Sequence, residues 1–147
     1  MIELDIDPNG DARVMVNDLI GQALDFWVCL CLGQKAKDIM ALSKPTQYSS
    51  DWSMCGPLLF DQRIATAPTP NGMWGAVWIR PENPSKLILP QSVRQGPPKV
   101  GAFAADPRIA ACRAFVAGIA SPQVTLPKHY HEVYIADLEA LKAEVEK

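Results

Sequence analysis

The chain has 147 residues, of which 48% are hydrophobic and 20% are charged, and a formal net charge of −2. These values exclude a chain that is disordered throughout, which would be far less apolar, and they lack the basic excess typical of nucleic-acid-binding proteins. No apolar run approaches the roughly 18 residues of a membrane span. We therefore expect a single globular domain over residues 1–147.

The four cysteines lie among apolar residues and follow no regular spacing: they are Cys29, Cys31, Cys55 and Cys112. The acidic, alternating start of the chain is unlike a secretion signal. Both observations predict reduced thiols in a cytosolic protein instead of a disulfide framework.

The N-terminal part of the chain predicts a β-hairpin followed by a helix. Apolar and polar residues alternate on both sides of the turn signal Pro8-Asn9-Gly10-Asp11, which is the pattern of two half-buried strands within residues 1–16. Asn17 is a favourable N-cap for the helix, and Gly33 favours its end. Between them, apolar residues recur at three- and four-residue spacing, so we expect a helix with one apolar face.

Prolines concentrate in the middle of the chain, where ten of the thirteen lie between residues 45 and 107. Each proline removes a hydrogen-bond donor and clashes with the preceding helical turn, so we expect long loops and little helix there. Residues 73–79 are apolar on both sides of the pleat and predict a central strand. Residues 86–89 predict the next strand, and residues 90–105 predict a loop.

The C-terminal third predicts two further helices. Asp106 is a favourable N-cap, Pro107 suits the first helical position, and Gly118 lies near the end of this helix. The last helix begins near Glu132 and carries a narrow apolar seam that packs either on its own domain or against a partner: Tyr134, Leu138, Leu141 and Val145. We therefore expect an α+β fold, with a small, mostly antiparallel sheet, two to three helices and long proline-rich middle loops.

The chemically densest segment of the sequence runs from Tyr48 to Pro57. It combines aromatic rings that stack on bases, hydroxyl and carboxylate groups that bond a ribose or a base edge, and a glycine that lets the backbone approach a ligand. These features suit a planar, polar ligand such as a nucleotide, and the candidate residues are Tyr48, Ser49, Ser50, Asp51, Trp52 and Gly56. The alternative is structural: the two aromatic residues fill the core, and Ser50 and Asp51 cap a turn or a short helix.

Two residues outside this segment have the same two interpretations. Trp74 lies on the predicted strand and either contributes to the ligand site or belongs to the core. Arg113 lies at the border of the apolar face of its helix, where a charge needs a partner. Its planar guanidinium suits a phosphate, and the equally open alternative is a salt bridge with one of three acidic residues: Asp25, Asp51 or Asp61.

The sequence lacks the common templates of catalysis and metal binding. It has no phosphate-binding loop, no glycine-rich dinucleotide loop and no Gly-x-Ser-x-Gly turn. Its two histidines, His129 and His131, have no third metal ligand nearby, and we expect both to be exposed near a loop. We therefore predict no catalytic residue, no metal and no cofactor, and the scarcity of general bases disfavours enzyme activity.

Several segments, taken in order, resemble the phage NinX-like family. They comprise a helix, a Tyr-Ser-x-Asp-Trp element, a tryptophan strand, a capped second helix and the segment after it: Leu19–Asp25 with Val28 and Gly33, Tyr48–Trp52 with Gly56-Pro57, Trp74–Ala76, Asp106–Ala117 and Val124–Pro127. The likeness covers about residues 14–127. It divides the domain into an extra hairpin at residues 1–16, a NinX-like core at residues 17–127 and an extra helix at residues 128–147.

The resemblance implies a small accessory protein of tailed bacteriophages or prophages that acts in the host cytoplasm. Dispensable phage proteins of this size often act against host defences, so the leading hypothesis is a non-enzymatic protein that binds a small nucleotide-like ligand and sequesters a signalling nucleotide of the host. We also expect a homo-oligomer, because shared pockets are common in such binders. Two alternatives stay open: a module that inhibits or redirects a host protein, and an enzyme that processes a nucleotide with Asp51 as acid or base.

Overall fold

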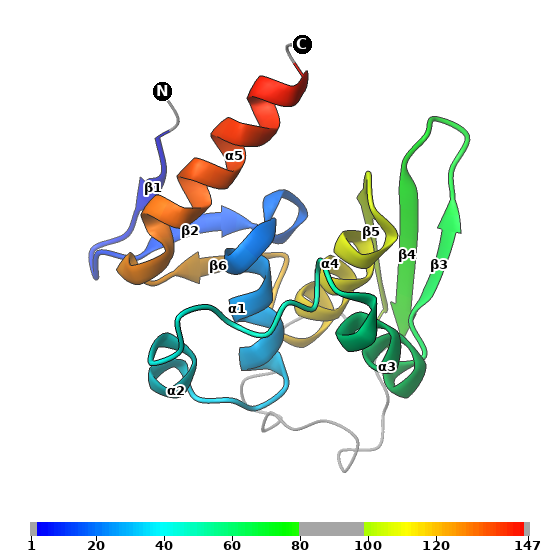
Figure 1. Cartoon of the computed structure of the whole chain (residues 1–147), viewed down its shortest axis with the longest axis horizontal. Helices are drawn as coiled ribbons and strands as arrows, with labels where there is room; N and C mark the ends of the chain where they lie inside the picture. Colours follow the sequence, from blue (N-terminus) through cyan, green and yellow to red (C-terminus); the bar gives the residue numbers. More distant parts are fainter. Residues whose placement is uncertain (1–2, 80–98, 146–147) are drawn as a thin grey trace.

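The computed structural model describes residues 3–79 and 99–145, which form an α+β fold (Figure 1). The first antiparallel sheet contains β1 (Asp5–Ile6), β2 (Ala12–Met15) and β6 (Gln123–Leu126), and the second contains β3 (Ala65–Pro68), β4 (Trp74–Ile79) and β5 (Lys99–Ala104). The helices are α1 (Gly21–Cys31), α2 (Ala36–Met40), α3 (Trp52–Gln62), α4 (Pro107–Ile119) and α5 (His131–Val145). The predicted α+β class is confirmed, although the described residues hold two sheets and five α-helices instead of one sheet and two or three helices. No helix in this part of the chain is long and apolar enough to cross a membrane.

The predicted N-terminal hairpin is confirmed, and β6 joins it from the far end of the chain. Asp5 lies opposite Arg13 across the hairpin, and Val14 lies opposite Val124 on the other side of β2. The Nε2 atom of His131 accepts a hydrogen bond from the backbone of β2 at 3.2 Å and lies 2.9 Å from a carbonyl oxygen of β6. His129 is exposed as expected, whereas His131 is partly buried because it links these two strands.

Helix α1 begins at Gly21, later than the predicted start at Asn17. The residues before it form a short 3-10 turn, η1 (Val16–Asp18). Gly21 has a φ of +60°, and a Cβ there would overlap the carboxylate of Asp137 on α5. That carboxylate accepts a hydrogen bond from the backbone N–H of Gln22. The cap of α1 is therefore supplied by a distant helix, which local sequence patterns do not reveal.

The core of the second sheet is built around Trp78 on β4. Its indole is fully buried against Phe115 of α4, with ring centroids 5.2 Å apart, and its N–H donates to the carbonyl of Gln62 at 2.8 Å. The ring also lies directly over Gly118, where no Cβ would fit. Gly118 therefore allows the close approach of α4 and β4, and α4 continues past it to Ile119.

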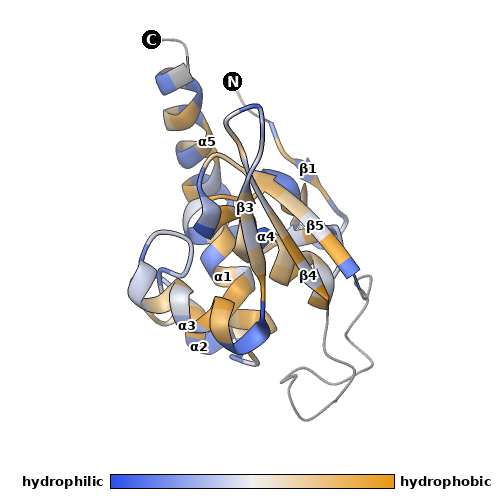
Figure 2. Ribbon diagram, turned by 90° about the vertical axis from the view of Figure 1, so that its right-hand side faces the viewer, coloured by the Kyte–Doolittle hydropathy of each residue, from blue (hydrophilic) through white to orange (hydrophobic). Residues whose placement is uncertain are grey.

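The predicted central strand is confirmed in β4, although one of its faces is open. The strand is central, between β3 and β5, but the side chains of Val77 and Ile79 are 47% and 65% exposed, and Phe103 on β5 is 56% exposed. Figure 2 shows this apolar colouring along β4 and β5. The predicted loop at residues 90–105 is also wrong for residues 99–104, which form β5, because pairing with β4 stabilises a segment of weak β-propensity. The strand predicted at residues 86–89 lies outside the described residues.

The proline-rich middle, where little helix was expected, contains a helix of 11 residues at the place where a short helix was one of the alternatives. Helix α3 includes Pro57 in its interior, where the missing N–H costs the hydrogen bond to Ser53. The helix nevertheless forms because Asp51 caps its start and because Cys55 and Leu58 are buried against the core. This element places two of the predicted site residues, Trp52 and Gly56, on a helix instead of a loop.

Candidate functional site

The Tyr48–Gly56 segment forms the entry into α3 and its first turn. Oδ1 of Asp51 accepts hydrogen bonds from the backbone N–H of Ser53 at 2.9 Å and from its hydroxyl at 2.7 Å. These two bonds hold the pKa of Asp51 below its usual value. Asp51 is thus the N-cap of α3, which is the structural alternative considered for this residue, and one of its carboxylate oxygens is committed to that role.

Trp52 does not fill the core. Its side chain is 51% exposed, and the guanidinium carbon of Arg108 on α4 lies 5.4 Å from its ring centroid. Arg108 also donates from Nη1 to the carbonyl oxygen of Ser50 at 2.7 Å and from Nη2 to Asp106 at 2.7 Å. The sequence analysis missed Arg108, whose only local signal is its position two residues after the N-cap Asp106. We call the group Ser50, Asp51, Trp52, Asp106 and Arg108 the Trp52–Arg108 surface.

The two charged residues of this surface that lie on α4 hold each other in place. The Arg108 guanidinium lowers the pKa of Asp106, and the Asp106 carboxylate raises the pKa of Arg108. Asp106 at the same time caps α4 by accepting the backbone N–H of Arg108 at 2.8 Å. The cation over Trp52 is therefore anchored to the end of a rigid helix, so its position needs little ordering when a partner binds.

The exposed side of α3 extends this surface with a second aromatic residue. Phe60 is 84% exposed and follows Trp52 and Gly56 at positions i, i+4 and i+8 of the helix. The position of a Cβ on Gly56 has no neighbour within 4 Å, so nothing in the described chain covers the helix between the two rings. We call Trp52, Gly56 and Phe60 the apolar stripe of α3.

Tyr48 and Ser49 turn inward instead of joining the exposed surface. The backbone N–H of Ser49 donates to Oδ1 of Asp25 at 2.8 Å, and Asp25 is only 2% exposed. Burial raises the pKa of Asp25 to about 6, an effect that the Ser49 hydrogen bonds partly offset. Tyr48 is half-buried against the core, and burial raises the pKa of its phenol. These two candidate residues therefore lie on the buried side of the segment and stabilise it.

A thiol contact lies one helical turn below the Trp52–Arg108 surface. Cys55 of α3 and Cys112 of α4 are both buried, and the hydrogen bond between their side chains lowers the pKa of Cys55 and raises that of Cys112. All four cysteines of the chain are buried, free thiols. Among the described residues, no group of three or more His, Cys, Asp or Glu side chains is arranged to hold a metal ion.

The remaining candidates, Trp74 and Arg113, make contacts with other parts of the chain. Trp74 is partly buried and packs against the core from β4. Arg113 donates from Nε to the carbonyl of Leu19 at 3.0 Å and from Nη1 to the carbonyl of Phe103 at 2.7 Å, and forms none of the salt bridges considered for it among the described residues. At 3.6 residues per turn, Arg108 and Arg113 are about 140° apart around α4, so the two cations face different sides of the molecule.

Comparison with protein families identifies the lineage of the chain. The family model described as bacteriophage P22 NinX matches residues 15–118, more than two thirds of the chain. The chain belongs to the bacteriophage P22 NinX family. It is accordingly a phage accessory protein. The search of curated proteins gave no match. The NinX match contains the Trp52–Arg108 surface and the apolar stripe of α3, whereas β6 and α5 lie outside it.

Proposed function

We propose that this NinX-family protein acts by binding and not by catalysis, and that the apolar stripe of α3 docks into an apolar groove of a host protein. The observation that carries the proposal is the exposure of two large aromatic side chains, Trp52 and Phe60, on one side of α3. Arg108 is fixed beside Trp52 by Asp106 and by the Ser50 carbonyl. Docking would inhibit or redirect the host protein.

The composition of this surface matches the physics of interface hot spots. Tryptophan and arginine are the residues whose truncation costs most at protein interfaces. An exposed helix that presents aromatic side chains at i and i+8, with a glycine between them, is suited to a hydrophobic groove on a partner. Transfer of a phenylalanine side chain such as that of Phe60 from water into such a groove contributes about 1.5–3 kcal/mol. The expected partner is therefore a host protein whose groove accommodates two aromatic rings.

A nucleotide-like ligand is the second candidate, and the pairing of Trp52 with Arg108 favours it. A base stacked on an aromatic side chain gains about 1–3 kcal/mol, and a neighbouring guanidinium suits a phosphate. Sites for small molecules are concave, however, and Trp52 does not line the cavities at Arg113, Trp27, Phe60 or Met73. An open surface favours a macromolecular partner, which is why the protein-binding role ranks first.

Photo-crosslinking in host cells tests the protein-binding role. A photoreactive phenylalanine analogue replaces Phe60 in one variant and Phe103, an exposed aromatic residue on the open sheet face, in a matched control. We expect a discrete crosslinked host protein from the Phe60 position and not from the Phe103 position. For that purified protein, Trp52→Ala should weaken the Kd at least about 30-fold, the equivalent of about 2 kcal/mol. Equal crosslinking from both positions, or an unchanged Kd for Trp52→Ala, would overturn the proposal.

Calorimetric titration separates the nucleotide-like ligand from the protein partner. Cyclic dinucleotides, cyclic trinucleotides and ADP-ribose derivatives are titrated into the wild-type protein and into Trp52→Ala. Heat that disappears in the variant would place the nucleotide-binding role first, and sequestration of a host signalling nucleotide would then be its expected consequence. The homo-oligomer and the host-cytoplasmic location stay predictions.

A further inference from the structure

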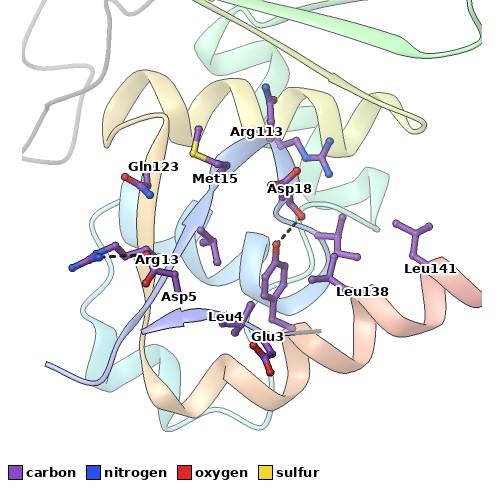
Figure 3. A pocket seen from close by; sticks show the side chains of 14 residues that line it. Glu3, Leu4, Asp5, Arg13, Met15, Asp18, Arg113, Gln123, Leu138 and Leu141 are labelled. Atoms are coloured by element: carbon purple, nitrogen blue, oxygen red, sulfur yellow. Dashed lines mark hydrogen bonds and ion pairs between the residues drawn. The ribbon is translucent and has the colours of Figure 1, made fainter. Parts of the chain in front are cut away.

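A cavity of about 460 Å³ lies between the N-terminal hairpin, η1, α4 and α5 (Figure 3). Its volume falls within the roughly 300–1,000 Å³ typical of small-molecule sites. Arg113 and Asp18 come from the part of the chain that matches the NinX family, whereas Glu3, Arg13, Leu138 and Leu141 come from the flanking segments. The cavity exists because α5 packs beside the start of α1, where the Tyr134 hydroxyl donates to the backbone carbonyl of Asp18 at 3.0 Å.

Arg113 places a partly buried cation at the wall of this cavity. Burial lowers the pKa of its guanidinium, and its hydrogen bonds go to two neutral acceptors, the carbonyl oxygens of Leu19 and Phe103. Among the described residues, no carboxylate oxygen lies within 4.0 Å of the Arg113 guanidinium, so Arg113 forms no ion pair there. Those two bonds occupy two of the five N–H groups of a guanidinium, so Arg113 retains donors for an anionic group of a ligand.

Asp18 places a carboxylate next to this cation. Figure 3 shows the Asp18 and Arg113 side chains close together, with Leu138 and Leu141 of α5 on the same side of the cavity. Burial lowers the pKa of Arg113, and the charge of Asp18 offsets part of that effect, although the two side chains do not form an ion pair. The Tyr134 hydroxyl bonds the Asp18 backbone, which leaves the carboxylate available. One cation, one anion and an apolar wall therefore lie within one small cavity.

The charges of the wall define which ligands fit. Arg13 is paired with Asp5 at 3.3 Å, so Arg113 is the cation at the wall that stands outside any ion pair of the described residues. Glu3 and Asp18 add negative charge, which disfavours a ligand with several phosphates. A molecule with one carboxylate, one ammonium group and an apolar tail offers one partner each for Arg113, Asp18 and the apolar part of the wall.

We propose that the cavity binds a free α-amino acid with an apolar side chain. The ligand carboxylate is held by Arg113, its ammonium group by Asp18, and its side chain contacts Leu138 and Leu141. This site is separate from the apolar stripe of α3, so a result at one does not decide the other. Trp52→Ala should leave binding in the cavity unchanged.

Matched ligands test the proposal by calorimetry on the full chain. The probes are L-leucine and L-phenylalanine, with N-acetyl-L-leucine lacking the ammonium charge and L-leucinamide lacking the carboxylate. We expect both amino acids to bind and each leucine derivative to bind at least tenfold more weakly than L-leucine. No binding of either amino acid up to about 10 mM, or equal binding of L-leucine and its derivatives, would overturn the proposal.

Variants then locate the site. Asp18 is exposed, so Asp18→Asn should fold normally and should weaken L-leucine binding at least tenfold, and Leu141→Ala should weaken it less. Asp38→Asn, an exposed carboxylate on α2, is the matched control and should bind like the wild type. Undiminished L-leucine binding by Asp18→Asn, with a wild-type circular dichroism spectrum, would place the ligand elsewhere and refute the site.

Discussion

Asp25 is a buried carboxylic acid, and its ionisation destabilises the folded protein at neutral pH. Its pKa rises from 3.8 to about 6 because burial penalises the charged form, while Ser49 offsets part of that effect. Between about pH 4 and pH 6 the folded protein therefore binds more protons at this site than the unfolded chain does. The free energy of unfolding consequently falls as the pH rises through this interval. At 1.36 kcal/mol per pKa unit, a shift of about two units amounts to about 3 kcal/mol.

The substitution Asp25→Asn removes this titration while it keeps a carbonyl oxygen for the N–H of Ser49. Between pH 4 and pH 7, the free energy of unfolding of the wild type should fall by about 3 kcal/mol more than that of the variant. Any change in the coupling to Asp137, which raises the pKa of Asp25, is subtracted from this difference. Urea unfolding at half-unit pH steps measures the difference. Asp38→Asn is the control and should follow the wild-type profile. Parallel profiles for Asp25→Asn and the wild type would refute the assignment of a raised pKa to Asp25.

Three further substitutions test the packing and the caps, each by thermal and urea unfolding. Gly118→Ala places a Cβ against the Trp78 ring and should cost about 1–3 kcal/mol, whereas Gly56→Ala adds a methyl group to an open helix surface and should stabilise by about 0.5–1 kcal/mol. The reverse order of these two would contradict the described packing of α3 and α4. Asp106→Ala removes an N-cap and the partner of Arg108, and should cost about 1–2 kcal/mol. A loss no larger than that of Asp38→Asn would argue against the cap.

Part of the candidate site followed from the sequence because its causes are local. Asp51 and Asp106 each act on backbone groups two residues ahead, so their capping roles were open to prediction from neighbouring residues. The density of aromatic and polar groups near Trp52 likewise marked the segment that the structure exposes. Arg108 was missed because its contact with Trp52 joins two helices far apart in the sequence. Arg113 was placed in the same site, yet helix geometry directs it to the other side of α4.

The α+β class, the N-terminal hairpin, the central strand β4 and the capped helix α4 all follow from local patterns of residues. Alternation, turn residues and caps act over a few neighbouring residues, so their consequences can be derived without the fold. Long-range contacts place the start of α1 against a carboxylate of α5, pair residues 99–104 as a strand, and stabilise a proline-containing helix at residues 52–62. They also decide which face of β4 stays open and which aromatic rings reach the surface. In each case the deciding contact comes from a residue distant in sequence, whose burial or hydrogen bond outweighs local propensity.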